Sequence, residues 1–205
     1  MDNYISINNQ RIDLTYEQVE KIKDSLKVSV CDMKLADVSA GETAKIGDHE
    51  MIVLEHTGDT TLLLLKGLLK DDQEFGENNN YNGSYVDAIC QEFAKEIATI
   101  VGESNIVLHD VDLTSDDGLK DYGQIQRYAS LLTTDQARRY VQILDKHKLD
   151  AWWWLATAWS TPVHNDSTWV KCVSPSGNFN GDYFGSGVYG VRPFCILKSD
   201  IFVSK

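Results

Sequence analysis

The chain has few basic residues and no long apolar run, and each shortage excludes a class of function. Its apolar runs, such as Leu62–Leu65, are far shorter than the ~20 residues that a membrane-spanning helix needs. Only 19 Lys and Arg stand against 31 Asp and Glu, which gives a net charge of −12. This balance disfavours nucleic-acid binding through a basic surface, because phosphates require cations to displace their counterions.

Signal-peptide, zinc and redox motifs are also missing. The first residues contain neither a basic nor an apolar segment, so we expect no signal peptide and a cytoplasmic or virion-associated protein. The four cysteines form no C-x-x-C pair and the five histidines form no H-E-x-x-H motif. We therefore expect reduced, buried thiols, and we assign no catalytic residue, no metal and no cofactor.

Two short motifs are present but fail on their context. Gly185–Gly190 matches G-x-G-x-x-G, yet Pro193 follows where a dinucleotide-binding motif must open a helix. We interpret these glycines as turn residues. The acidic stretch that starts at Asp112 resembles a calcium loop, but Gly123 stands where the twelfth-position Glu is needed, so we expect a solvated loop.

Charge and aromatic residues are unevenly distributed along the chain. Residues 151–205 hold four Lys or Arg and three Asp, a net charge of +1, so residues 1–150 carry −13. The same 55 residues contain 11 of the 20 aromatic side chains and all three prolines. The composition thus divides the chain into an acidic body and a nearly neutral, aromatic, turn-rich end.

Hydrophobic periodicity and capping signals predict an α+β fold, with helices mainly before residue 150 and a strand- and loop-rich C-terminal part. We predict a small N-terminal hairpin-helix appendage over residues 1–40 and one larger domain over residues 41–205. The expected helices begin at Thr15, Ser84 and Thr133, and the second ends at Gly102. The expected strands cover residues 4–7, 11–14, 51–55, 60–66, 106–108, 152–159, 168–174 and 190–197.

Three consecutive tryptophans, Trp152, Trp153 and Trp154, indicate an organising centre of the C-terminal half. Side chains alternate along a strand, so at least one of these large rings must lie in the core. Arg192 precedes Pro193, a position that favours extended backbone. We predict a structural role for Arg192, with its guanidinium bonded to backbone carbonyls or to a carboxylate beneath the loops.

Residues 159–189 mix aromatic side chains with Asn, Ser and Gly, a composition typical of antibody paratopes. A binding surface and ordinary loops both fit this composition. If it is a binding surface, the rings of Trp159, Tyr183, Phe184 and Tyr189 should be exposed. The candidate ligand-binding residues are Trp159, His164, Asn165, Asn178, Asn180, Asp182, Tyr183, Phe184, Ser186 and Tyr189.

Three segments near the C-terminus carry a family resemblance: Trp152–Leu155, Trp169–Gly177 and Gly190–Phe194. They resemble a bacterial and phage domain of unknown function whose sequence contains W-W-L and ends in G-V-R-P. That family is similar to the formylglycine-generating-enzyme branch of the C-type-lectin-like fold. The resemblance covers about residues 41–198, and it departs at 155–157, where Leu-Ala-Thr replaces the usual Leu-Arg-Ser.

The resemblance implies a C-type-lectin-like fold for residues 41–205 and a non-enzymatic module that binds a protein ligand. Some relatives are variable proteins of diversity-generating retroelements, so residues 159–189 are expected to vary in a phage, prophage or bacterial protein. Two alternatives stay open. One is an intracellular inhibitor whose acidic body docks on a host protein. The other is an oxidase of the formylglycine-generating type that uses Cys172 and Cys195.

Overall fold

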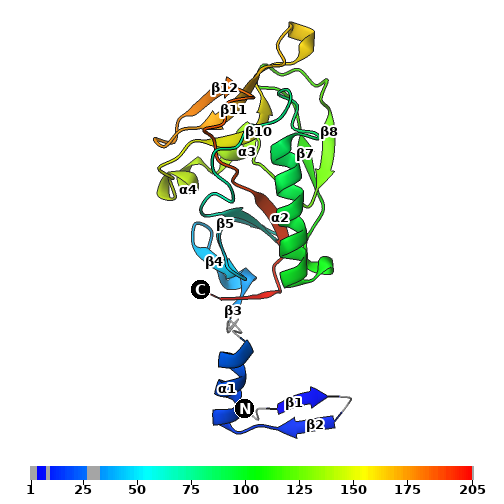
Figure 1. Ribbon diagram of the computed structural model, residues 1–205, viewed down its shortest axis with the longest axis vertical. Coiled ribbons are helices and arrows are strands. Elements are labelled where there is room, and N and C mark those ends of the chain that lie inside the picture. The colour runs from blue at the N-terminus through cyan, green and yellow to red at the C-terminus, as the bar shows by residue number, and fades with distance from the viewer. Residues whose placement is uncertain (1–3, 8–9, 27–32, 205) are drawn as a thin grey trace.

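The computed structural model describes residues 4–7, 10–26 and 33–204 as a mixed α/β fold in which strands predominate (Figure 1). Its helices are α1 (Tyr16–Leu26), α2 (Tyr85–Val101), α3 (Thr134–Arg139) and α4 (Val141–Lys146), with 3₁₀ turns η1 (Leu35–Asp37), η2 (Glu103–Asn105) and η3 (Pro162–His164). The first strands are β1 (Tyr4–Ile7), β2 (Gln10–Asp13), β3 (Met33–Lys34), β4 (Thr43–Ile46), β5 (His49–Thr57), β6 (Thr60–Leu65) and β7 (His109–Asp112). The others are β8 (Gln124–Arg127), β9 (Ala129–Ser130), β10 (Trp153–Ala158), β11 (Trp169–Val173), β12 (Phe179–Tyr183), β13 (Phe194–Lys198) and β14 (Phe202–Val203). The α-helices of the described part all lie before residue 150, as predicted.

The N-terminal elements follow the local sequence signals. Strands β1 and β2 pair antiparallel, and a capping box opens α1, because Thr15 and Gln18 each accept the other's backbone N–H through the side chain. Strand β3 then pairs with β14. Leu35 and Val38 are fully buried against residues of the following segments. The domain boundary between residues 40 and 41 stays a prediction.

A five-stranded antiparallel sheet, ordered β4-β5-β6-β13-β9, is buried on both faces. On one face Met51 and Val53 of β5 pack against α2 in the Phe93 cluster, named after the α2 ring at its centre. On the other face Ile52 and Leu54 pack against α3 and α4 in the Trp153 cluster. Burial on both faces explains why Leu62–Leu65 of β6 are four consecutive apolar residues.

Helix α2 covers one face of this sheet and begins and ends where the sequence predicts (Figure 1). The Ser84 side chain accepts the N–H of Asp87 at 3.1 Å and so caps the first turn. At the other end Gly102 takes a φ of 91°, which a residue with a side chain rarely adopts. Its N–H donates to the carbonyl of Ala98 at 2.8 Å.

Strand β10 belongs to a second antiparallel sheet, ordered β10-β11-β12, and both of its faces are buried. Trp153 and Leu155 lie in the Trp153 cluster. Trp154 and Ala156 point the other way, into the Trp154 cluster, which also holds Phe75, Tyr81 and Tyr189. The two rings are 2% and 0% exposed, so the prediction of at least one core tryptophan is confirmed.

Trp152 precedes β10 and differs from the two tryptophans that follow it. Its side chain is 36% exposed and meets the ring of Tyr189 edge-on, with 5.7 Å between centroids. The run therefore supplies two core rings and one ring at the surface.

The strand expected at residues 190–197 begins only at Phe194, and two other elements also differ from the sequence predictions. The strand expected at residues 106–108 lies instead at β7, because Ile106 makes only an isolated bridge to Leu197. The helix expected from Thr133 has the predicted capping box but is divided into α3 and α4 at Tyr140, whose φ and ψ are −101° and 16°. The Tyr140 hydroxyl donates to Glu55 at 2.6 Å, a tertiary contact that local sequence signals do not reveal.

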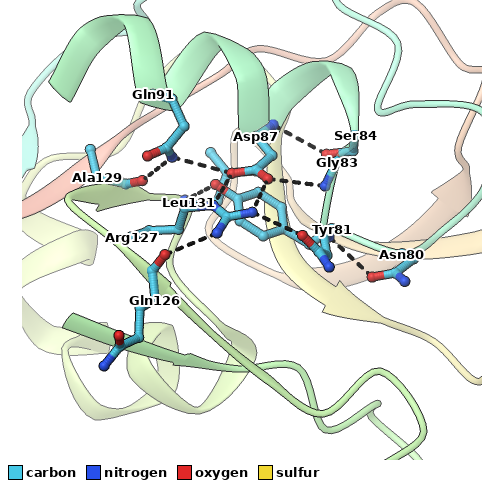
Figure 2. Close-up of polar contacts among 11 residues, drawn as sticks. Asn80, Tyr81, Gly83, Ser84, Asp87, Gln91, Gln126, Arg127, Ala129 and Leu131 are labelled. Carbon is cyan, nitrogen blue, oxygen red and sulfur yellow. Dashed lines mark hydrogen bonds and ion pairs between the residues drawn. The ribbon is translucent and has the colours of Figure 1, made fainter. Parts of the chain in front are cut away.

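An ion pair with a buried carboxylate joins α2 to the strands beside it (Figure 2). Arg127 of β8 donates through Nε and Nη2 to the two carboxylate oxygens of Asp87, at 2.8 and 2.7 Å. Asp87 is 3% exposed and also accepts the N–H of Gly83, while Gln91 bridges Asp87 to the carbonyl of Ala129. These bonds satisfy a carboxylate that would be costly to bury alone.

Arg192 is a buried cation, and it is 1% exposed. Its Nε donates to the carbonyl of Leu65 at 2.8 Å, and Nη2 donates to the carbonyls of Lys66 and His147 at 2.9 and 3.3 Å. The guanidinium carbon lies 5.2 Å from the centroid of the Trp153 ring. Burial lowers the pKa of Arg192 to about 10. The contacts to backbone carbonyls are of the predicted kind, and they join three separate segments.

Replacing Trp153 or Trp154 by Ala should reduce the free energy of unfolding by about 3–5 kcal/mol, because each change leaves a large cavity in a different cluster. Urea denaturation of the two single variants measures the loss. Trp152→Ala is the matched control and should lose less than about 1 kcal/mol. Wild-type stability in both core variants would contradict a core built on these rings.

Arg192→Lys should destabilise the protein by about 2–4 kcal/mol, because an ammonium cannot reproduce the planar set of donors that three carbonyls accept. Arg138→Lys makes the same exchange at a side chain that is 53% exposed and should be nearly neutral. Equal urea midpoints for the two variants would show that the Arg192 contacts add no stability.

Candidate ligand-binding groove

The second sheet presents one face to the core and part of the other face to the surface. In β11, Val170 and Cys172 point into the Trp154 cluster. Trp169 and Lys171 alternate with them and point to the opposite, outer face. Their antiparallel partners in β12 are Tyr183 and Gly181, so these four positions share the outer face of the sheet.

An open groove of about 490 Å³ lies over this outer face. Helices α3 and α4 cover the end of the face nearest Trp153, through the Trp153 cluster, and leave the other end open. Trp159 and Trp169 are each 45% exposed, and Tyr183 beside them is 48% exposed. The lining residues are Trp159, Asp166, Trp169, Lys171, Phe179, Asn180 and Gly181.

The ring of Trp159 forms part of the groove floor, and Gly181 makes room for it. A Cβ atom at Gly181 would lie 2.8 Å from Cε3 of Trp159, closer than carbon atoms pack. The ammonium of Lys171 sits 4.4 Å from the centroid of the same ring, within cation–π range. The absence of a side chain at position 181 therefore lets Trp159 reach across β11 to β12.

Lys171 is itself a buried cation, and Asp116 neutralises its charge. Its Nζ lies 3.1 Å from Asp116 Oδ2, and the lysine side chain is 6% exposed. Asp116 also pairs with Arg138 at 3.2 Å. The charge under Trp159 is therefore held by a fixed partner and is not available as a free cation at the surface.

The acidic loop between β7 and β8 is largely exposed, as expected, and it also binds the segment that carries Trp159. Asp117 accepts hydrogen bonds from Ser115 at 2.5 Å and from Ser160 at 2.6 Å. His164 lies 2.9 Å from the same carboxylate, and Thr161 donates to Asp121. These bonds hold the pKa of Asp117 well below its usual range, with the Ser115 contact as the largest cause.

Asn79 fixes the other side of the same segment. Its side-chain amide donates to the carbonyls of Ser160 and Trp169, each at 3.0 Å, and its side-chain oxygen accepts the hydroxyl of Tyr122 at 2.6 Å. Asn79 is fully buried. The loops around the groove are therefore held by buried polar contacts.

The structure brings only some of the predicted residues to the groove. Trp159 and Asn180 line it, and Tyr183 adjoins it through its pairing with Trp169. Phe184 is half-buried, and its ring packs 4.4 Å from that of Tyr183. Its exposure is therefore lower than we expected.

Tyr189 is buried, and the expectation of an exposed ring is wrong. It is 5% exposed and stacks on Trp154 with 4.0 Å between centroids. Its hydroxyl donates to Asp182 at 2.6 Å. Burial and this carboxylate raise the pKa of Tyr189 above its usual range. Asp182 lies on the inner face of β12, and its bond to Tyr189 holds that ring in the core.

The remaining predicted residues lie in turns outside the groove lining. His164 and Asn165 belong to the η3 turn, where Asn165 takes a left-handed φ of 57°. Asn178 precedes β12 and donates its N–H to Ser174, whereas Ser186 follows the strand and bonds to Tyr183. These residues occupy opposite ends of β12, so the predicted set does not form one surface.

Trp169, Lys171 and Phe179 line the groove but were not among the predicted site residues. The signal for Trp169 was available in the alternation of β11. If Val170 and Cys172 face the core, Trp169 and Lys171 must face outward. The part of Phe179 depends on the register of the β11–β12 hairpin, which no local motif reports.

The two cysteines of the oxidase alternative lie in different clusters. Cys172 belongs to the Trp154 cluster and Cys195 to the Phe93 cluster. Both are buried free thiols, and burial raises their pKa values to about 11 and about 12. Within the described residues, no group of three His, Cys, Asp or Glu side chains could hold a metal ion.

Residues 107–199 match a family model described as "Domain of unknown function (DUF6273)". No curated protein and no solved structure matches the chain significantly. The matched range extends from β7 to β13 and contains the whole groove sheet. This similarity supports the predicted resemblance to a family of unknown function. None of the described helices has the length and apolar character needed to cross a membrane.

Truncation of the exposed aromatic residues of this region should lower the melting temperature much less than truncation of a buried one. The double change Trp169→Ala with Tyr183→Ala should lower the melting temperature by less than about 4 °C, because it removes surface rings. Tyr189→Ala should lower it by about 6–12 °C, because a ring stacked in the core is lost. Calorimetry of both variants measures the contrast. A larger fall in the double variant would place the groove rings in the core.

Proposed function

We propose that the chain is a non-enzymatic module that binds a protein ligand in the groove over the β10-β11-β12 sheet. The observation that carries this proposal is the cluster of half-exposed rings of Trp159, Trp169 and Tyr183 on a rigid, buried support. Burial of large aromatic side chains releases free energy, so their presence at one open site favours a surface that a ligand covers.

The support beneath these rings suits recognition. Strands β10 and β11 are anchored in the Trp153 and Trp154 clusters, and the loop segments are held by Asp117 and Asn79. A site that is ordered before binding loses little conformational entropy when the ligand arrives. Aromatic anchors on such a support typically provide most of the binding energy.

Our proposal extends to the family features that the resemblance implies. Residues 41–205 would have a C-type-lectin-like fold, and residues 159–189 would be the variable region of a retroelement-diversified protein of phage, prophage or bacterial origin. The turns at both ends of β12, with Asn178 and Ser186, are supportive because they carry small polar side chains away from the core. A reverse-transcriptase gene and a near-copy of this coding segment beside the gene would be expected.

The groove proposal is tested with a random-peptide display library on the immobilised full chain. Peptides selected on the wild type should bind the Trp169→Ala, Tyr183→Ala double variant at least about tenfold more weakly, because two anchors are gone. Phe202→Ala is the matched control, since this ring is 61% exposed in β14, outside the groove lining. It should leave the affinity unchanged.

Two results would contradict the proposal. One is a failure to enrich any peptide above the background of a blank surface. The other is equal affinity of the selected peptides for the wild type and the double variant. The second result would favour docking on the acidic body, as the inhibitor alternative requires.

A further inference from the structure

Strand β12 is an edge of its sheet, so one side of its backbone has no strand partner in the described fold (Figure 1). The backbone N–H of Ser174 donates to the carbonyl of Asn178, and the backbone N–H of Phe184 donates to the carbonyl of Thr168. These bonds fix the antiparallel alternation, in which residues 180 and 182 turn their backbone groups toward β11. Residues 179, 181 and 183 therefore turn theirs outward.

The outward groups at the end of β12 are occupied, but those in its middle are open. The N–H of Tyr183 donates to the Asp182 side chain at 2.7 Å, and its carbonyl accepts the N–H of Ser186 at 2.9 Å. Among the described residues, no hydrogen bond engages the outward N–H and carbonyl groups of Phe179 and Gly181. These two residues offer two donors and two acceptors in the spacing that another strand requires.

The charges around this edge favour a cationic ligand. Asp166 lines the groove, where its carboxylate accepts hydrogen bonds from Thr168 and pairs with no cation among the described residues. The nearby cations are already paired, Lys171 with Asp116 and Lys148 with Asp145. The net charge of −12 adds long-range attraction for a basic partner.

The exposed rings beside the edge favour arginine among the cations. Trp169 and Tyr183 face each other across β11 and β12 and are about half exposed. A residue that pairs with Gly181 from outside would point its side chain to the same face as Gly181, over the groove. A guanidinium there can stack on an aromatic face, which an ammonium does less well.

We propose that the ligand is an extended, arginine-bearing segment of a protein that adds to β12 as a fourth strand. Its backbone pairs with the open groups of Phe179 and Gly181, and alternate arginine side chains enter the groove beside Trp169 and Tyr183. This inference rests on the proposed function and specifies the chemical class of the ligand. Strand addition of this kind takes affinity from the backbone and specificity from alternate side chains.

Three forms of one short synthetic peptide that alternates Arg and Thr test the inference on the full chain. The first is unmodified. The second is N-methylated at each Arg, which removes the N–H groups that would face β12 and keeps the cations. The third is N-methylated at each Thr, whose N–H groups would face solvent. Amide hydrogen exchange of Phe179 and Gly181 is followed by NMR, and binding is followed by tryptophan fluorescence.

The unmodified and Thr-methylated peptides should slow exchange at Phe179 and Gly181 at least about tenfold at saturation, because both amides become hydrogen-bonded. The Arg-methylated peptide should bind at least about tenfold more weakly and give no protection. A peptide alternating Glu and Thr should not bind. Equal protection by both methylated forms, or equal binding of the Glu peptide, would overturn the inference.

Two further outcomes separate this inference from the proposed function. If the library peptides bind the groove and depend on Trp169 and Tyr183 while the two amides stay unprotected, strand addition is wrong and the groove proposal stands. If the amides become protected with rising protein concentration alone, and sedimentation shows a dimer, then a second copy of the chain occupies the edge. That result also overturns the inference.

Discussion

The burial of β10 on both of its faces is the constraint on which the rest of the described fold depends. Trp153 and Trp154 are neighbours in sequence, yet they lie in two different hydrophobic clusters on opposite sides of one strand. Each cluster recruits elements that are far apart in the chain. The Trp153 cluster holds α3, α4 and the face of the five-stranded sheet that carries Ile52 and Leu54. The Trp154 cluster holds the start of α2 and the chain before β13.

This arrangement also limits where the proposed ligand could bind. Because β10 is enclosed, its sheet can offer only the far part of one face and the edge at β12. The loops over that part are held by contacts with distant segments, through Asp117, Asn79 and the Lys171–Asp116 pair. The acidic body and the aromatic end, which differ so clearly in composition, both contribute to the proposed site. The body supplies Asp116 and Asp117, which hold Lys171 and the loop at Ser160, and the end supplies the rings and Asp166.

The sequence predicts what depends on local chemistry and fails where tertiary contacts decide. The caps at Ser84 and Thr133 were predictable because they bond within one helical turn. The exposure of Tyr189 was not, because its burial depends on a stack with Trp154 that is 35 positions away. The groove was half predictable for the same reason. Trp159 was identified from the composition of residues 159–189. Phe179 lies in the groove only because of the register of the β11–β12 hairpin.

The pairing of β3 with β14 places both ends of the larger described part of the chain close together. This short ribbon brings the strand that follows the N-terminal helix against the last described strand, at the end of the body opposite to β11 and β12 (Figure 1). Any carrier joined through either side of that ribbon would be attached at the pole away from the groove. A tether there would leave the proposed groove facing outward.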